Sequence, residues 1–496
     1  MRKLFLIGGM IAAIILSGCG NDTKPDTTPP VITLVGVTPI DIVQNSTYTD
    51  AGATAQDYID GDITESIVTN NPVNTNKIGQ YTITYNVSDA AGNAADEVSR
   101  TVNVVAEEIT KAFFGDKENN QVVVVAVEKM ELLDEVPTGH LITYTADNVF
   151  MHPKVYVVNR GSNAIDVLDT NTIEITKTID LDHFPRSSEQ MNKTLRLNET
   201  SGMDKAMASI IDVDTDEVVA AVGTNVKVDT DNNPNYGGSH ATGHPFWLDA
   251  HHFAILDRYV RKVITYHIEK DINDEWVTTK LSEVPTTTSI HQIVPSKGNY
   301  QGKPGFFYGT AEGATDIYPS IIEFELVSGV GLEKRREVQL KKDGVDVNSM
   351  WLHHGDFHPT EPLMYVGSGD GTMFIVDYEK MEIAKTIQAG KGAGHTVMIP
   401  QKNLAVVINH KDVFVTIVDI KTNTKIADIT VSDHDEWVGN ETIQAHPKYH
   451  VSKDGKYFYA FLTKEGVMYE MDLDTLRVAR SVEVGGQPAQ GSFIKY

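Results

Sequence analysis

The sequence predicts an all-β protein with at least two domains. Its 496 residues exceed what one hydrophobic core usually holds, and its hydrophobic fraction of 41% is ordinary for a globular chain. From about residue 31 the chain consists of short β-prone runs separated by turn residues. From about residue 111 these runs follow a longer pattern that repeats, which predicts a second domain built from repeats.

The first 19 residues are typical of an export leader. Arg2 and Lys3 precede an apolar run at 4–16, which ends in the letters LSGC at 16–19. This ending resembles the lipoprotein cleavage box of bacteria, and the resemblance implies that Cys19 becomes a lipidated N-terminus. Cys19 is the only cysteine, so an intramolecular disulfide is excluded. The apolar run of about 13 residues is shorter than the roughly 20 that cross a membrane as a helix.

The lipoprotein resemblance also implies a location. Gly20 stands where an aspartate would signal retention in the inner membrane. We therefore expect an outer-membrane lipoprotein that faces the periplasm or the cell surface. Residues 20–30 are polar and rich in Thr, Asp and Pro, which predicts a tether between the lipid and the first domain.

Residues 31–106 are predicted to form a small β-sandwich, because short strands alternate with turns throughout. The matching letters are TPPVITL (28–34), YTDAGA (48–53), DGDIT (60–64) and YNVSDAAGNA (85–94). They resemble the bacterial immunoglobulin-like repeats of secreted and surface proteins, which implies a spacer or adhesion module without catalysis. Asp57, Asp60 and Asp62 are most simply residues of a solvated turn, with a calcium set as the alternative.

Residues 111–496 are predicted to form a β-propeller. The text VYVVNRGSNAIDVLD (155–169) contains two strands and a turn, and comparable text recurs about every 40–58 residues, as expected for four-stranded blades. We count eight blades, with seven as the alternative because the fifth is irregular. Residues 487–496 would supply the missing inner strand of the blade that starts near Phe113. The text resembles YVTN-type propellers and, more distantly, the propeller of nitrous-oxide reductase.

The formal net charge of −26 argues against a nucleic-acid partner, because binding a phosphate backbone requires basic surface. A negative field attracts cations, although only diffusely. Solubility alone is the simpler explanation of the charge.

Histidine is confined to the predicted propeller, since all 17 histidines lie after residue 139. His244, His354 and His395 each stand nine residues before the second strand of their blade. The innermost strand of each blade lines the central channel, so residues at this offset in different blades converge at one mouth. Arg186 holds the same place in another blade, and His291 begins the corresponding strand of the fifth.

Several imidazoles at one mouth favour a zinc or copper site. The predicted ligands are His244, His291, His354, His395 and His446. The alternative is a channel lined by polar residues that bond to water or to one another. Blue copper is disfavoured because the only cysteine is Cys19, and c-type haem is excluded because the chain has no Cys-x-x-Cys-His.

Other residues near these positions are candidates for supporting roles. Arg186 would repel a metal ion but suits an anion or a carboxylate. His353 is expected to face away from His354, because successive residues of a strand face opposite sides. His410 is expected at a turn or on the surface. The supporting set is His140, His353, Asp249, Asp356, His450 and Arg186.

Three functions remain open from the sequence. The first is an extracytoplasmic propeller that carries, buffers or senses zinc or copper; it resembles in outline the periplasmic propellers that pass zinc to transporters, on histidine placement alone. The second is a surface adhesion or scaffold protein without metal. The third is a metal-dependent redox enzyme, by analogy with nitrous-oxide reductase, whose cupredoxin domain this chain lacks. The expected partners are the membrane, through the lipid, and a metal transporter or a surface protein.

Overall fold

The structure is a computed structural model of the whole chain. It describes residues 25–106, 109–139, 143–149, 151–190, 195–200, 206–224, 242–244, 246–258, 260–295, 304–439, 442–444 and 449–495. The predicted leader and Cys19 lie outside these residues. The chain divides into two compact units, Met1–Glu108 and Ile109–Tyr496. Among the described residues, no helix has both the length and the apolarity to cross a membrane.

The first unit is a β-sandwich. One sheet consists of β1 (Val31–Leu34), β3 (Ala53–Asp57) and β4 (Gly61–Asp62). The other has the order β2 (Ile40–Val43), β7 (Val98–Val105), β6 (Gly79–Asn86) and β5 (Val68–Asn70). Alternate residues of β6 and β7 face inward, and Ile83, Tyr85 and Val102 form the core with Ile32. The predicted sandwich is confirmed.

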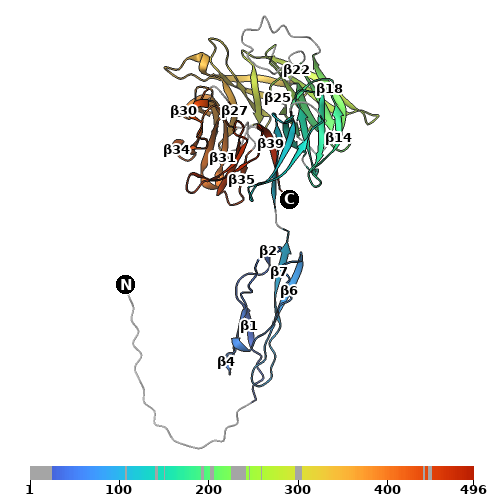
Figure 1. Cartoon of the computed structure of the whole chain (residues 1–496), viewed down its shortest axis with the longest axis vertical. Helices are drawn as coiled ribbons and strands as arrows, with labels where there is room; N and C mark the ends of the chain where they lie inside the picture. Colours follow the sequence, from blue (N-terminus) through green and yellow to red (C-terminus); the bar gives the residue numbers. More distant parts are fainter. Residues whose placement is uncertain are drawn as a thin grey trace, which may run out of the picture. The chain divides into compact units, whose positions relative to one another are not determined.

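The second unit consists of four-stranded antiparallel groups, as the repeats predict (Figure 1). The described strands form six four-stranded sheets and one eight-stranded sheet, in which a single parallel pair, Thr145–Gln490, joins two four-stranded groups. We call the resulting eight groups blades 1 to 8. The strands of each blade are given from the innermost outward. Blade 1 is β39 (Pro488–Lys495), β8 (Thr110–Asp116), β9 (Gln121–Ala126) and β10 (Glu131–Pro137), and blade 2 is β11 (Thr143–Asn148), β12 (Lys154–Asn159), β13 (Ala164–Asp169) and β14 (Glu174–Asp180). Blade 3 is β15 (Pro185–Gln190), β16 (Leu195–Thr200), β17 (Ala206–Asp212) and β18 (Glu217–Thr224), and blade 4 is β19 (Phe246–Trp247), β20 (His252–Asp257), β21 (Lys262–Lys270) and β22 (Trp276–Pro285).

Blades 5 to 8 follow the same order. Blade 5 is β23 (Ile290–Pro295), β24 (Phe306–Ala311), β25 (Ser320–Val327) and β26 (Gly331–Gln339), and blade 6 is β27 (Leu352–Phe357), β28 (Leu363–Ser368), β29 (Thr372–Asp377) and β30 (Glu382–Gln388). Blade 7 is β31 (Ala393–Ile399), β32 (Leu404–Asn409), β33 (Phe414–Asp419) and β34 (Thr424–Thr430), and blade 8 is β35 (His450–Val451), β36 (Tyr457–Leu462), β37 (Val467–Asp472) and β38 (Arg477–Glu483). The predicted all-β architecture of a sandwich followed by a propeller is confirmed.

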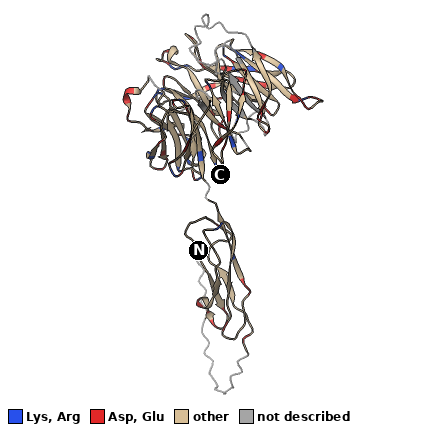
Figure 2. Cartoon of the chain, turned by 45° about the vertical axis from the view of Figure 1, so that its right-hand side comes forward, with Lys and Arg blue, Asp and Glu red and all other residues tan. Residues whose placement is uncertain are grey.

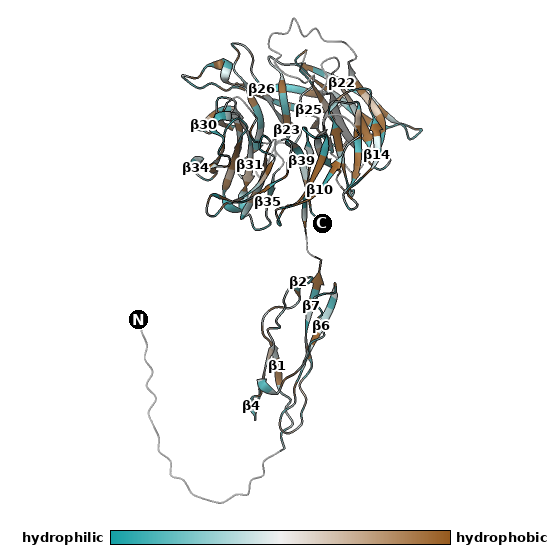
Figure 3. Ribbon diagram, viewed as in Figure 1, coloured by the Kyte–Doolittle hydropathy of each residue, from teal (hydrophilic) through white to brown (hydrophobic). Residues whose placement is uncertain are grey.

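The apolar core lies between neighbouring blades. The second and third strands of a blade are buried on both faces, and this explains their unbroken apolar runs, such as residues 122–125. One cluster joins Val406 of blade 7 to Phe458 of blade 8, and another joins Leu256 of blade 4 to Phe324 of blade 5. The outermost strands are exposed and polar, so the most hydrophobic ribbons lie inside the unit (Figure 3). Acidic and basic residues both occur on strands and on loops (Figure 2).

The C-terminal strand completes the blade that starts the propeller. β39 pairs antiparallel with β8, with Lys495 opposite Thr110 and Ser492 opposite Phe113. The red end of the chain accordingly lies beside the first cyan strands (Figure 1). The prediction that residues 487–496 supply the missing inner strand near Phe113 is confirmed.

The inner strands share an irregularity near their start. The pairing register with the second strand shifts in β11, β15, β23, β27, β31 and β39. In β23 the shift falls between Ile290 and Gln292, and in β27 between Leu352 and Gly355. Such bulges insert an extra residue and redirect the side chains around it. His291, His353 and His354 lie within these two bulges.

Candidate metal centre

The antiparallel pairing of inner and second strands sets the position of the site. The start of an inner strand lies beside the end of the second strand, as in the pairs Ile290–Ala311, Leu352–Ser368 and Ala393–Asn409. Two kinds of sequence position therefore meet at one mouth of the propeller. One is the start of the inner strand, and the other is the residue that follows the second strand.

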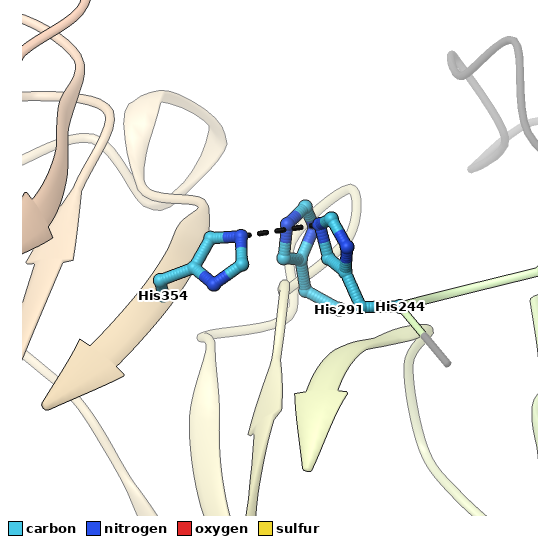
Figure 4. A group of neighbouring side chains, drawn as sticks. All are labelled: His244, His291 and His354. Atoms are coloured by element: carbon cyan, nitrogen blue, oxygen red, sulfur yellow. Dashed lines mark hydrogen bonds between the residues drawn. The ribbon is translucent and has the colours of Figure 1, made fainter. Parts of the chain in front are cut away.

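Three of the predicted ligands form a first group, which we call the outer triad: His244, His291 and His354. One ring nitrogen from each lies within 4.8 Å of the others. His244 immediately precedes blade 4, and its backbone N–H donates to the carbonyl of His291 at 2.9 Å. The Nε2 atoms of His244 and His354 are 3.1 Å apart. The rings approach one another from three separate elements (Figure 4).

A second group, the inner triad, consists of His353, His395 and His410, whose ligand atoms also lie within 4.8 Å of one another. All three are at least nine-tenths buried. The two triads are in direct contact. The ring of His354 stacks on that of His395 at 4.0 Å, and the ring centroids of His291 and His353 are 4.3 Å apart. Six histidines from blades 4 to 7 therefore form one continuous cluster.

Hydrogen bonds fix the orientation of three of these rings. His291 donates from Nδ1 to Glu312 Oε1 at 2.6 Å, and Arg258 pairs with the other oxygen of Glu312. His353 and His410 place Nδ1 against backbone carbonyls, those of Gly394 at 3.3 Å and Gln444 at 3.1 Å. A carbonyl or a carboxylate only accepts, so each of these Nδ1 atoms carries the proton. Nε2 is then the atom able to bind a metal, the arrangement typical of histidine ligands.

Burial keeps the deepest ring neutral. It lowers the pKa of His410 to about 4, against a weaker raising effect of the bond to the Gln444 carbonyl. A neutral imidazole is the form that binds metal. His410 is therefore ready to act as a ligand across the physiological pH range.

Gly394 makes room for the inner triad. A Cβ on this residue would collide with the His410 ring and would lie 3.1 Å from His353 Nδ1. A side chain at this position would thus displace two of the three histidines. The glycine is explained by packing, since its φ is not in the left-handed region.

The predicted ligand set divides into three parts. His244, His291 and His354 gather in the outer triad, and His395 belongs to the inner triad. His446 and the supporting candidate His140 lie outside the described residues. Arg186 lies in β15, where only the backbone is described.

The prediction that His353 faces away from His354 is wrong. Their ring centroids are 4.7 Å apart, and both rings also contact His395. The physical reason is the bulge between Leu352 and Gly355, which breaks the alternation of side chains along β27.

The other supporting candidates lie outside both triads. Asp249 accepts from His252 Nδ1 at 2.9 Å and from two backbone N–H groups; burial raises its pKa, but these bonds outweigh it and lower the pKa overall. Asp356 Oδ1 accepts the Phe357 N–H at 2.8 Å. His450 stacks on Phe493 at 5.5 Å, and burial lowers its pKa.

Sequence reasoning missed three residues of the site: Arg258, Glu312 and His410. His410 lies in the turn that follows β32, as one of the two expectations had it, but it is only 3% exposed, so the surface alternative is wrong. These three residues share one position, since each directly follows the second strand of its blade. That shared offset is a sequence signal as regular as the nine-residue offset of the inner-strand histidines.

Comparisons with known proteins identify the two units by fold. Residues 32–104 match the family model of the Ig-like domain of bacterial surface proteins. The chain is similar to the solved structure of dihydro-heme d1 dehydrogenase NirN in complex with DHE, with 12% identity, a TM-score of 0.56 and coverage of 78% of this chain and 74% of that one. It is also similar to Citrobacter koseri AztD, with 11% identity, a TM-score of 0.50 and coverage of 78% and 98%. Both are β-propeller proteins. No curated protein sequence matches the chain.

Proposed function

We propose that this protein is an extracytoplasmic, lipid-anchored propeller that binds zinc or copper and carries, buffers or senses the metal. The observation that carries the proposal is the outer triad, in which ring nitrogens of His244, His291 and His354 lie within 4.8 Å of one another. The three residues come from separate blades, so the fold itself assembles the ligand set.

The spacing of the rings suits a small borderline cation. In a tetrahedral zinc site with Zn–N bonds of 2.0–2.1 Å, two ligand nitrogens are about 3.3 Å apart. The Nε2 atoms of His244 and His354 are 3.1 Å apart, so a small adjustment accommodates an ion between them. Glu312 holds His291 in the ligating tautomer, as second-sphere carboxylates do in zinc sites. Copper accepts the same imidazole set.

The charge balance favours a metal that exchanges. Imidazole binds a metal in its neutral form, so the six histidines bring no negative charge, and the carboxylate of Glu312 is already paired with Arg258. A divalent ion would keep most of its charge in a largely buried place, which weakens binding relative to a site with anionic ligands. The contact between the two triads also gives a departing ion a second set of ligands. Both features suit a carrier or a buffer more than a permanent structural site.

A surface adhesion or scaffold protein without metal is the second candidate. The observation that favours it is the match of residues 32–104 to a domain of bacterial surface proteins. This function makes no use of the histidine cluster. Metal binding therefore separates the two candidates.

The test is metal analysis of the purified chain from residue 20 onward, after reconstitution with zinc or copper at neutral pH and gel filtration. We expect metal that co-elutes with the chain, and a lower metal content in the combined variant His244→Ala, His291→Ala, His354→Ala. The matched control substitutes His251, His252 and His267, which also cluster, with ring centroids 4.9 and 6.1 Å apart, but form no ligand triad. A metal-free wild-type chain would overturn the proposal.

A further inference from the structure

Three aspartates of the Ig-like unit lie together at one end of the sandwich. Asp26 belongs to the segment that enters β1, Asp57 ends β3, and Asp89 begins the loop after β6. One carboxylate oxygen from each lies within 4.8 Å of the others. The sequence places these residues far apart, so their meeting is a product of the fold.

Asp57 has an oxygen with no hydrogen-bond donor. Its Oδ1 accepts the backbone N–H groups of Ile59 at 2.8 Å and Asp60 at 2.7 Å. Its Oδ2 is buried and accepts no hydrogen bond, and the residue as a whole is 7% exposed. Leaving a buried carboxylate oxygen unsatisfied is costly, so a cation at this place would compensate it.

The negative charges are also unbalanced. Asp89 is 8% exposed and is bonded to the backbone N–H and the side-chain amide of Asn93, both at 2.7 Å. Asp26 Oδ1 accepts the Thr28 N–H at 3.0 Å. Among the described residues, no Lys or Arg pairs with any of the three aspartates, and the buried Arg100 pairs with Asp50. Three carboxylates at this spacing repel one another unless a cation lies between them.

We propose that Asp26, Asp57 and Asp89 bind a calcium ion. Calcium takes hard oxygen ligands at 2.3–2.6 Å, so oxygens on opposite sides of the ion are up to about 5.2 Å apart. The three carboxylate oxygens lie within 4.8 Å of one another, so one ion can reach all three. Backbone carbonyls and water supply the remaining ligands of such sites. Magnesium needs a tighter octahedron, and zinc prefers nitrogen or sulfur.

The three aspartates differ from the set that the sequence offered as the alternative to a solvated turn. Asp57 remains, but Asp60 Oδ2 accepts the Ala90 N–H at 2.7 Å and Asp62 is exposed, with Oδ1 on the Thr64 N–H at 3.0 Å. Asp26 and Asp89 replace them. Because Asp26 lies just before β1, a bound ion would fix the entering segment to the sandwich. The Asp26 carbonyl already accepts the Asn93 amide at 3.2 Å.

The test is calorimetric titration of the chain from residue 20 onward with CaCl₂, after removal of divalent ions with EDTA. We expect one site in the Ig-like unit and at least a ten-fold loss of affinity in Asp26→Asn and in Asp57→Asn. Asp57→Asn keeps the Oδ1 acceptor of its turn, and Asp26→Asn lies outside the strands, so both variants should fold. Asp62→Asn is the matched control and should bind like the wild type.

Two further measurements make the result decisive. Calcium should raise the melting temperature of the Ig-like transition in scanning calorimetry, and less so in Asp26→Asn. The variant that lacks His244, His291 and His354 should bind calcium normally, which separates this site from the propeller cluster. Absence of calcium binding at millimolar concentration, or equal binding by Asp26→Asn, Asp57→Asn and the wild type, would overturn the proposal.

Discussion

His244 and His354 are separated by 110 residues in the chain, yet their Nε2 atoms lie 3.1 Å apart. Two neutral imidazoles at this distance share one proton, which one ring donates and the other accepts. A metal ion would replace that proton and bind both nitrogens at once. The pair is therefore close to the spacing of two ligands on one metal ion.

Substitution of Glu312 by Gln tests the orientation of His291. A neutral amide bonds the Nδ1–H more weakly than a carboxylate does and can present its own N–H instead, so the ring loses its fixed tautomer. We expect the dissociation constant for zinc to rise about 10- to 100-fold. Competition with a chromophoric chelator measures it.

The control for this variant is Glu325→Gln, in the same blade but paired with Arg335 away from the cluster. A zinc affinity near that of the wild type in Glu312→Asp would support the role of the carboxylate in positioning His291. An unchanged zinc affinity in Glu312→Gln, with the melting temperature preserved, would count against the oriented site.

Gly394→Ala tests the inner triad. The added methyl group meets the rings of His410 and His353, so we expect a loss of about 1–3 kcal/mol in the stability of the propeller. The amount of metal bound at saturation should also fall, while the outer triad remains intact. Gly139→Ala is the control, because nothing lies within 4 Å of a Cβ at that residue. Equal behaviour of the two variants in thermal unfolding would contradict the packing argument.

The Glu470–Arg480 pair predicts a pH dependence of stability. Burial raises the pKa of Glu470, but hydrogen bonds from Arg480 and Tyr459 outweigh burial and lower the pKa below its ordinary value of 4.5. The stabilisation is therefore complete above pH 4.5 and is lost as the pH falls through the lowered pKa. At pH 7 we expect Glu470→Gln to cost about 1–2 kcal/mol, since Arg480 is nearly half exposed.

Thermal unfolding at pH 7 and near pH 3 measures this difference. Glu323, paired with Arg336 at the equivalent place in blade 5, provides an internal replicate. If Glu470→Gln is less stable than the wild type by the same amount at both pH values, the ion pair with Arg480 is not the source of the pH dependence.

Cys19→Ser tests the membrane anchor. If Cys19 carries the lipid, the variant loses the modification and moves from the membrane fraction to the soluble fraction. Fractionation of cells, with labelling by a radioactive fatty acid, measures both changes. Labelling of the variant at the wild-type level would contradict the lipoprotein assignment.

The fold followed from sequence patterns because each pattern has a direct physical cause. Alternating residues in β6 and β7 match a half-buried sandwich, and the recurring strand text matches blades that bury their middle strands. The pairing of β39 with β8 was predictable because the first repeat lacked an inner strand.

The site was less accessible to sequence reasoning. The offset shared by His244, His354 and His395 identified residues that do lie together, but it did not show that they belong to two triads. The position of His353 depends on a bulge, which depends on pairing with β28 and leaves no mark in the β27 sequence. His410 was missed because only the inner strands were considered, whereas the residue after the second strand reaches the same place.

Closure of the ring determines the order in which the propeller can fold. The Gln487 N–H bonds to Asp116 Oδ1 at 2.8 Å across 371 residues of chain. A contact of such high sequence separation has a large loop-closure entropy and forms slowly. The blade that is synthesised first is thus the last to be completed. Until Pro488–Lys495 is available, one edge of β8 is unpaired, and an unpaired strand edge promotes aggregation of the incompletely folded chain.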